Sequence, residues 1–231
     1  MSRGKKLETM WNRRTATWHD HVGASTAFDH VRAAVLAEAA GSAGSSAVDL
    51  GAGTGFLTLA LAPDVDKIIA VDVSPSMLDK LAADAAADGL ENVRCLVADL
   101  AIVDLPEASV DLVVSSYALH HLRDVDKRAL IVRTKRWLRP GGRLVVADMM
   151  FGRGATAQDR RILRSKVRSL VRKGPGGVWR IAKNLVRFGL RVGADRPVPP
   201  QFWVDALVAA GFGDVEYRPI VAEAGLVIGS A

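Results

Sequence analysis

The chain has 231 residues, of which 49% are hydrophobic and 24% are charged. This length suits one well-buried domain over residues 1–231, and the composition excludes disordered, fibrous and collagen-like chains. No run approaches the roughly 18 consecutive apolar residues that span a bilayer. The basic start MSRGKKLETMWNRR also lacks the apolar stretch of a signal peptide, so we expect a cytoplasmic protein.

The net charge of +6 is unevenly spread along the chain. Residues 153–196 hold 13 Lys and Arg against 2 Asp and Glu, whereas the remaining residues hold 18 against 23. One cationic segment therefore accounts for the basic character. A lone cysteine, Cys95, excludes an intramolecular disulfide and a thiolate zinc cluster, and its apolar neighbours in VRCLV predict a position in the core.

The predicted elements alternate between helix and strand. Residues 1–40 have helical spacing and end at the break GSAGSS. Apolar, β-branched runs then predict strands at 47–50, 67–73, 93–99, 110–116 and 142–149. Helices are predicted at 56–62, 76–88, 124–138 and 202–212, with closing strands at 215–221 and 224–230. This alternation predicts an α/β fold in which helices cover both faces of a parallel sheet.

A glycine-rich turn follows the first predicted strand. The sequence VDLGAGTGF puts Gly51, Gly53 and Gly55 between that strand and a helix. Glycine allows the sharp turn and the close approach of a ligand to bare backbone, while free N–H groups at the helix start face that ligand. The dinucleotide fingerprint needs Gly or Ala at its sixth position, and this chain has Phe56. A nicotinamide cofactor is therefore disfavoured.

Five motifs carry a family resemblance: VDLGAGTG, AVDVSPSML, CLVADL, VDLVVSSYALHHL and LRPGGRLVVAD. In this order and spacing they resemble the class I S-adenosylmethionine-dependent methyltransferases, in the small-molecule branch similar to the ubiquinone/menaquinone-type enzymes. The resemblance covers about residues 47–150. It implies a Rossmann-like sheet of seven strands, the last antiparallel, with S-adenosylmethionine lying across the carboxyl ends of the strands.

Acids at the strand ends are the main candidates for holding that cofactor. The carboxylate of Asp72 can accept both ribose hydroxyls, or it can instead cap the helix that starts after Ser74. Asp99 would accept from the adenine amino group, unless it is only a turn residue. Met77 would pack on adenine or in the core. Asp49 would hold the glycine turn or reach the methionine ammonium through water.

The resemblance extends these assignments to the fourth strand and the N-terminus. Ser115, Ser116 and Tyr117 should flank the methionine part and the methyl group, and Leu100 should lie beside adenine. A helix within 1–40 would fold over the cofactor with Trp18 closing the site, although an aromatic residue at this spacing can equally pack in the core. The predicted cofactor-binding residues are Asp49, Gly51, Ala52, Gly53, Gly55, Asp72, Val73, Met77, Asp99, Leu100, Ser115, Tyr117 and Trp18.

Methyl transfer from a sulfonium requires little acid–base help. The protein aligns the nucleophile, excludes water and, for an oxygen or carbon acceptor, removes a proton. His120 and His121 in YALHHL follow the fourth strand, at the edge where an acceptor should sit. His120 is the candidate base, or it only starts a helix and contacts the adenosyl region. His19, His21 and His30 lack the spacing of metal ligands, so we expect no metal site.

The cationic segment 153–196 is predicted to form a helical cap after the fifth strand. Both halves have amphipathic spacing, and KGPGG joins them. This cap could close the pocket of a small-molecule acceptor, dock on an anionic membrane surface or bind nucleic acid. Nucleic-acid binding is disfavoured because no RNA-recognition motif is present. We favour a lipid or isoprenoid acceptor. A non-catalytic membrane- or partner-binding module on the same scaffold is the alternative function.

Overall fold

Seven strands form one mixed sheet. The computed structural model describes residues 3–15, 26–41, 44–152, 160, 164, 195–221 and 223–231. The strands are β1 (Ser46–Leu50), β2 (Lys67–Asp72), β3 (Val93–Val97), β4 (Val110–Ser116), β5 (Leu138–Met149), β6 (Gly213–Pro219) and β7 (Ala224–Ser230). Their order is β3-β2-β1-β4-β5-β7-β6. β1 to β5 are parallel, and β7 runs antiparallel to β5 and β6. The predicted α/β, Rossmann-like sheet with an antiparallel last strand is confirmed.

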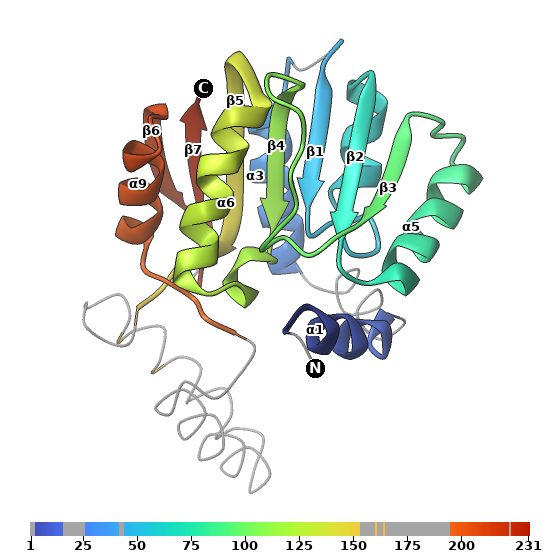
Figure 1. Cartoon of the computed structure of the whole chain (residues 1–231), viewed down its shortest axis with the longest axis horizontal. Helices are drawn as coiled ribbons and strands as arrows, with labels where there is room; N and C mark the ends of the chain where they lie inside the picture. Colours follow the sequence, from blue (N-terminus) through green and yellow to red (C-terminus); the bar gives the residue numbers. More distant parts are fainter. Residues whose placement is uncertain are drawn as a thin grey trace, which may run out of the picture.

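Helices cover both faces of this sheet (Figure 1). α3 (Thr26–Ala39) and the short α4 (Thr58–Leu61) pack on one face, where they meet Leu112 and Val114 of β4. α6 (Asp124–Trp137) and α9 (Pro200–Ala209) pack on the other, where they meet Val113. Side chains alternate between faces along a strand, so β4 needs apolar residues on both sides.

Local signals fix the start of α5 (Pro75–Ala87), which packs against β2 and β3. The Oγ of Ser74 accepts a hydrogen bond from the N–H of Met77, and Pro75 occupies the first helical turn. Both features are typical of helix N-termini. This cap sets the direction in which the chain leaves the end of β2.

Some predicted boundaries differ from the structure. β5 begins at Leu138, before the predicted start at residue 142. Val110 pairs with Leu138, but Leu112 already pairs with Arg143, so the pairing is irregular between them and the strand includes LRPGG. The core position predicted for Cys95 is wrong, since this residue is exposed. It lies on β3, which is at one edge of the sheet. The predicted cationic cap lies outside the described residues, apart from 160, 164 and 195–196.

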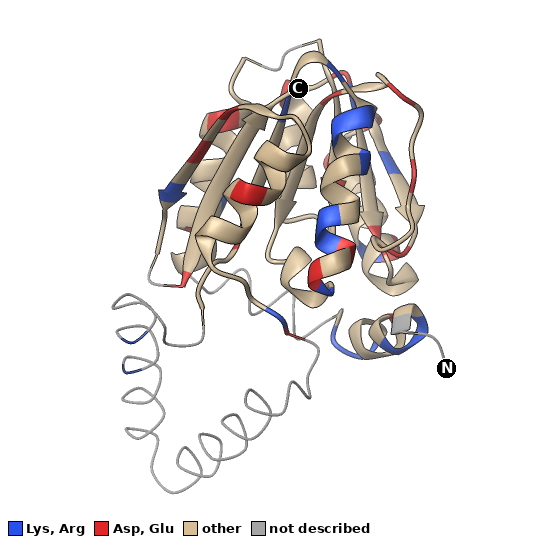
Figure 2. Ribbon diagram, turned by 60° about the vertical axis from the view of Figure 1, so that its left-hand side comes forward, with Lys and Arg blue, Asp and Glu red and all other residues tan. Residues whose placement is uncertain are grey.

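The N-terminal helix α1 (Arg3–Asn12) lies apart from the two helical layers, beneath the carboxyl ends of the parallel strands in Figure 1. Two short 3-10 turns, η1 (Ala62–Asp64) and η2 (Leu119–His121), complete the described elements. Lys and Arg residues gather on α1 and along α6 (Figure 2). In the part of the chain that the structure describes, no helix has the length and apolar character needed to cross a membrane.

Candidate active site

A tight glycine turn follows β1 and borders a cleft at the carboxyl edge of the sheet. Gly51 and Gly53 have φ values of 79° and 55°, in the left-handed region that favours glycine. The N–H groups of Gly51 and Ala52 donate to the carbonyl of Val71 over 2.7 and 3.0 Å. A Cβ on Gly51 would lie 2.2 Å from the Cβ of Ala118. The turn is therefore tied to β2 and leaves bare backbone facing the cleft.

The carboxylate of Asp72 lies at the centre of the cleft wall. Its Oδ2 accepts a hydrogen bond from the N–H of Gly53 over 3.0 Å, and its Oδ1 accepts from the N–H of Ser74 over 2.9 Å. The residue is only 8% exposed, and burial raises its pKa. A carboxylate oxygen can accept more than one hydrogen bond. Both oxygens of Asp72 can therefore still accept hydrogen bonds from a ligand.

A second buried carboxylate, that of Asp49, also lines the cleft. Its Oδ2 accepts a hydrogen bond from the Oγ of Thr58 over 2.7 Å. Burial raises the pKa of Asp49 to about 7, despite the stabilising hydrogen bond from Thr58, and the nearby charge of Asp72 adds to the rise. A cation arriving next to this group would favour its ionised form.

The predicted adenine wall is assembled from the ends of β2 and β3. Val73, Met77, Asp99 and Leu100 all line the cleft, and Met77 is buried. The Oδ1 of Asp99 accepts a hydrogen bond from the N–H of Ala101 over 2.9 Å, which shapes the loop after β3. The structure therefore brings these four residues together along the cleft, and their contact with adenine stays a prediction.

Helix α1 contributes to the cleft from beneath the carboxyl ends of the strands (Figure 1). Leu7 and Trp11 line it, and the ring of Trp11 lies 5.3 Å from that of His121, centroid to centroid. The Oδ1 of Asn12 accepts hydrogen bonds from the Oγ of Ser74 over 2.6 Å and of Ser76 over 3.0 Å. These bonds join α1 to the start of α5. Trp18, the predicted aromatic lid residue, lies outside the described residues.

Two predicted site residues lie behind the cleft rather than in it. The Oγ of Ser115 is buried and donates to the carbonyl of Leu50 over 2.7 Å, which joins the ends of β4 and β1. A Cβ on Gly55 would lie 2.9 Å from the Cγ of Leu59, so Gly55 permits close packing of the turn.

Tyr117, in contrast, does line the cleft. Its φ is 49°, and burial raises the pKa of its hydroxyl.

His120 is held by a buried carboxylate just beyond the cleft. Its Nδ1 lies 2.6 Å from the Oδ1 of Asp148, and its backbone N–H donates to the Oδ2 over 2.8 Å. Only 5% of His120 is exposed. The adjacent His121 does line the cleft, and its Nδ1 lies 3.2 Å from the Oδ1 of Asp195. Burial lowers the pKa of His121.

Several cleft residues were not predicted. Apolar and aromatic side chains form most of this group. Thr54, Phe56 and Leu57 lie within or just after the glycine turn, whereas the others come from elements far from it in sequence. Phe28 of α3, for example, packs 4.5 Å from the ring of Tyr117, centroid to centroid. The signal available was weak: aromatic residues in amphipathic N-terminal segments also pack in ordinary cores. Ser116 and His121 line the cleft, at and just after the end of β4, where the sequence places them. The unpredicted lining residues are Leu7, Trp11, Phe28, Thr54, Phe56, Leu57, Ala118 and Leu122.

The central segment of the chain matches known methyltransferase sequences. Residues 47–142 match the family model described as a methyltransferase domain. An uncharacterized methyltransferase of Bacillus velezensis is 37% identical over 110 residues, which cover 47% of this chain and 49% of that protein. Phosphoethanolamine N-methyltransferase 1 of Triticum aestivum is 34% identical over 122 residues, 52% of this chain and 24% of that protein. The matched parts thus span about half or less of these relatives.

Solved structures share the fold of the described residues. The crystal structure of the cyclase SpnF superimposes with a TM-score of 0.71 and covers 99% of this chain and 96% of its own. The sequence identity is 16%, so this likeness concerns the fold alone. The segment matched by the methyltransferase model includes the glycine turn, Asp72, Asp99 and His120.

Proposed function

We propose that this chain, which carries a class I methyltransferase domain, transfers the methyl group of S-adenosylmethionine to a small, hydrophobic or lipid-like acceptor. The observation that carries the proposal is the joint position of the glycine turn, Asp72 and Asp99. They follow the adjacent strands β1, β2 and β3 and line one cleft. Ligands of open α/β sheets bind at the carboxyl ends of the strands, so this is the expected place for a nucleoside.

The cleft residues fit the polar groups of S-adenosylmethionine. Asp72 would accept the ribose hydroxyls on the lone pairs left free by Gly53 and Ser74, and Asp99 would accept from the adenine amino group. The bare backbone between Gly51 and Gly53 leaves room for the methionine part, whose ammonium would favour ionised Asp49. When bound, the cofactor supplies an electrophilic methyl group on a sulfonium, so the protein mainly aligns the acceptor and excludes water.

We propose that His120, which lies just beyond the cleft rather than in its lining, removes the proton of an oxygen or carbon acceptor that reaches its Nε2. Carboxylate oxygens only accept hydrogen bonds, so the 2.6 Å contact with Asp148 keeps the proton on Nδ1 of His120. The Nε2 lone pair is then the one available to take a proton. Asp148 also stabilises the positive charge that His120 acquires, as a carboxylate does for a general-base histidine.

The acceptor class rests on sequence rather than on geometry. The 13 basic residues of 153–196 alternate with apolar ones, as expected for a segment that meets a lipid or isoprenoid acceptor at an anionic surface. The likeness to ubiquinone/menaquinone-type enzymes points the same way. The wheat relative is named for phosphoethanolamine, a polar acceptor, so a test must offer both chemistries.

The activity is tested with S-adenosylmethionine labelled in its methyl group. The full chain is incubated with either a bacterial lipid extract containing quinols or with phosphoethanolamine, and the labelled product is partitioned between organic and aqueous phases. We expect label in the organic phase, and at least about a tenfold lower rate for His120→Asn. Label on phosphoethanolamine alone would overturn the acceptor class. No transfer to either would favour the non-catalytic module.

Association with membranes is tested by co-sedimentation with vesicles. We expect binding to anionic but not neutral vesicles, weakening as salt rises, because each nearby basic residue contributes about 1 kcal/mol on an anionic surface. Changing Arg180, Lys183 and Arg187 together to Gln should weaken it. Equal binding by that variant would contradict the membrane role, and salt-sensitive binding to RNA in a parallel gel-shift assay would favour a nucleic-acid acceptor instead.

A further inference from the structure

Helix α6 carries a lysine whose side chain is completely buried. The Nζ of Lys127 donates to the carbonyl of Leu122 over 3.0 Å, to the Oδ1 of Asp124 over 3.0 Å and to the carbonyl of Arg196 over 2.7 Å. An ammonium has three N–H donors, so all of them are used. Burial lowers the pKa of Lys127. The three hydrogen bonds compensate for the free energy lost when the charged ammonium leaves water.

Lys127 joins two segments that frame His120. Leu122 ends the turn that contains His120 and lines the cleft. Arg196 lies where the chain returns from residues 153–194, and its N–H donates to the carbonyl of His120 over 2.6 Å. Both backbone groups of Arg196 are therefore engaged: its N–H with the histidine and its carbonyl with the lysine. The ammonium fixes the backbone that carries the proposed base.

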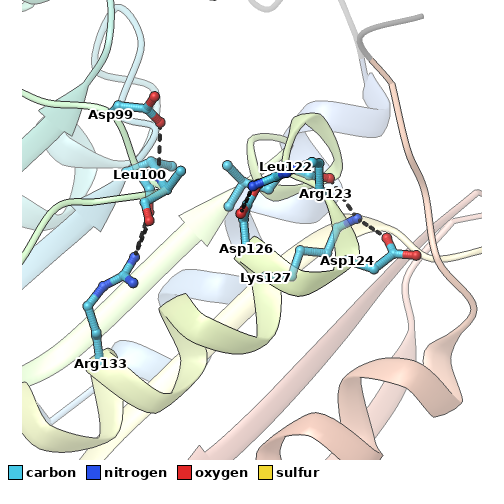
Figure 3. A network of polar contacts seen from close by, with 9 residues as sticks. Asp99, Leu100, Leu122, Arg123, Asp124, Asp126, Lys127 and Arg133 are labelled. Atoms are coloured by element: carbon cyan, nitrogen blue, oxygen red, sulfur yellow. Dashed lines mark hydrogen bonds and ion pairs between the residues drawn. The ribbon is translucent and has the colours of Figure 1, made fainter. Parts of the chain in front are cut away.

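Arg133 makes a similar contact with the other side of the cleft. Its Nη2 donates to the carbonyl of Leu100 over 2.9 Å and to that of Ala101 over 3.1 Å. These residues belong to the loop in which Asp99 accepts from the N–H of Ala101. Figure 3 shows Arg133 and Lys127 reaching from the same helix to these two separate loops.

We propose that α6 positions the two sides of the cleft independently, with Arg133 as a positioning residue for the cofactor side and Lys127 for the acceptor side. The proposal rests on the proposed function. The two cations are six residues apart, which is about 9 Å along a helix. Arg133 holds carbonyl groups of the loop after β3, whereas Lys127 holds those of Leu122 and Arg196, the two segments that frame His120. A substitution at either position should therefore affect one side of the cleft and spare the other, whereas a purely stabilising role would affect both alike.

The test compares Arg133→Met and Lys127→Met in the full chain, with Lys135→Met as the matched control on α6. Lys135 contacts the ring of Phe212 at 5.3 Å and neither of the two loops. S-adenosylhomocysteine calorimetry reports on the cofactor side. Hydrogen exchange of residues 195–200 reports on the acceptor side, because three of these residues are prolines and only 195, 196 and 198 carry amide protons.

We expect Arg133→Met to weaken S-adenosylhomocysteine binding by about 5- to 10-fold and to leave exchange at 195–200 unchanged. Lys127→Met should accelerate exchange at Arg196 by about tenfold or more, with binding within about twofold of wild type. In the labelled-methyl assay, Arg133→Met should raise the KM for the cofactor and Lys127→Met should lower kcat. Lys135→Met should change neither.

If Lys127→Met does not fold, Lys127→Gln, which keeps an uncharged hydrogen-bond donor, provides a milder variant. We expect it to accelerate exchange at Arg196 in the same way but by a smaller factor. The proposal is wrong if both substitutions weaken cofactor binding equally, or if Lys127→Gln folds with unchanged exchange at Arg196. Wild-type protein that does not bind S-adenosylhomocysteine would instead contradict the proposed function. Wild-type binding that Arg133→Met leaves intact would contradict this inference alone.

Discussion

The two sides of the cleft are built by different means. On the cofactor side, backbone N–H groups meet a carboxylate within one strand–turn–helix–strand unit: Asp72 binds the N–H groups of Ser74 and of Gly53, which is 19 residues away. On the acceptor side, side chains join segments that are farther apart: His120 meets Asp148, 28 residues away, and Lys127 meets Arg196, 69 residues away. The glycine turn and its acid therefore lie within residues 46–74, whereas the second side is assembled from segments spread over most of the chain's second half.

This difference predicts which substitutions change cofactor binding. A change in the glycine turn or its acid should reduce binding directly, because the ligand would contact those groups. A change around Asp148 or Lys127 should mainly affect the acceptor side. The substitutions below test the contrast, from the largest expected effect on cofactor binding to the smallest.

Gly53→Val should abolish binding of S-adenosylhomocysteine, by more than about 100-fold, while the protein remains folded. A branched residue is strained at a φ of 55°, and its side chain would fill the space next to the backbone. Calorimetry and circular dichroism on one sample measure both properties. Gly89→Val is the control, since Gly89 also has a positive φ but nothing lies near its Cβ position. Retained binding by Gly53→Val would show that the turn is only structural.

Asp72→Ala should weaken S-adenosylhomocysteine binding by about 1.5–3 kcal/mol, the usual loss for hydrogen bonds to a charged group. The variant also releases the N–H groups of Gly53 and Ser74, so its melting temperature must be measured alongside. Asp84→Ala on α5, which removes an ion pair with Lys80, serves as the control and should bind normally. Wild-type affinity in Asp72→Ala would rule out the ribose assignment.

Asp49→Asn should change S-adenosylhomocysteine binding least of the three. Its main effect should be on how the free energy of unfolding depends on pH. The pKa of about 7 in the folded protein exceeds the unfolded value of 3.8, so folding favours the protonated acid. Stability from this group is therefore full below pH 4 and is lost as pH rises towards 7. We expect denaturant unfolding to show Asp49→Asn gaining about 1–2 kcal/mol over wild type at pH 8 and little at pH 4. A gain independent of pH would contradict the shifted pKa.

Of the residues around the cleft, the sequence predicted those of the glycine turn and the ends of β2 and β3 more completely than the contacts around His120. Gly51, Gly53, Asp72 and Asp99 could be found because short motifs place them at strand ends, and strand ends share one edge of a parallel sheet. The alternation of strands and helices predicted the sheet for the same reason: it is repeated along the chain. The exposure of Cys95 could not be predicted, because an apolar run looks the same in an edge strand and in a central one.

The contacts of the acceptor side have no such local signal. Asp148 appears in the sequence as one more acid at a strand end, and its pairing with His120 depends on the register of β4 and β5. Lys127 reads as an exposed cation of an amphipathic helix, yet the return of the chain at Arg196 buries it. Burial by a distant segment cannot be inferred from the residues on either side.

The central claim is that the cleft binds S-adenosylmethionine, and calorimetric titration of the wild-type chain with S-adenosylhomocysteine and, in parallel, with NAD tests it most directly. We predict one site that binds S-adenosylhomocysteine with a dissociation constant of micromolar order, which corresponds to a binding free energy of about −8 kcal/mol. We predict no heat of binding with NAD. Binding of NAD in place of S-adenosylhomocysteine, or of neither, would contradict the account.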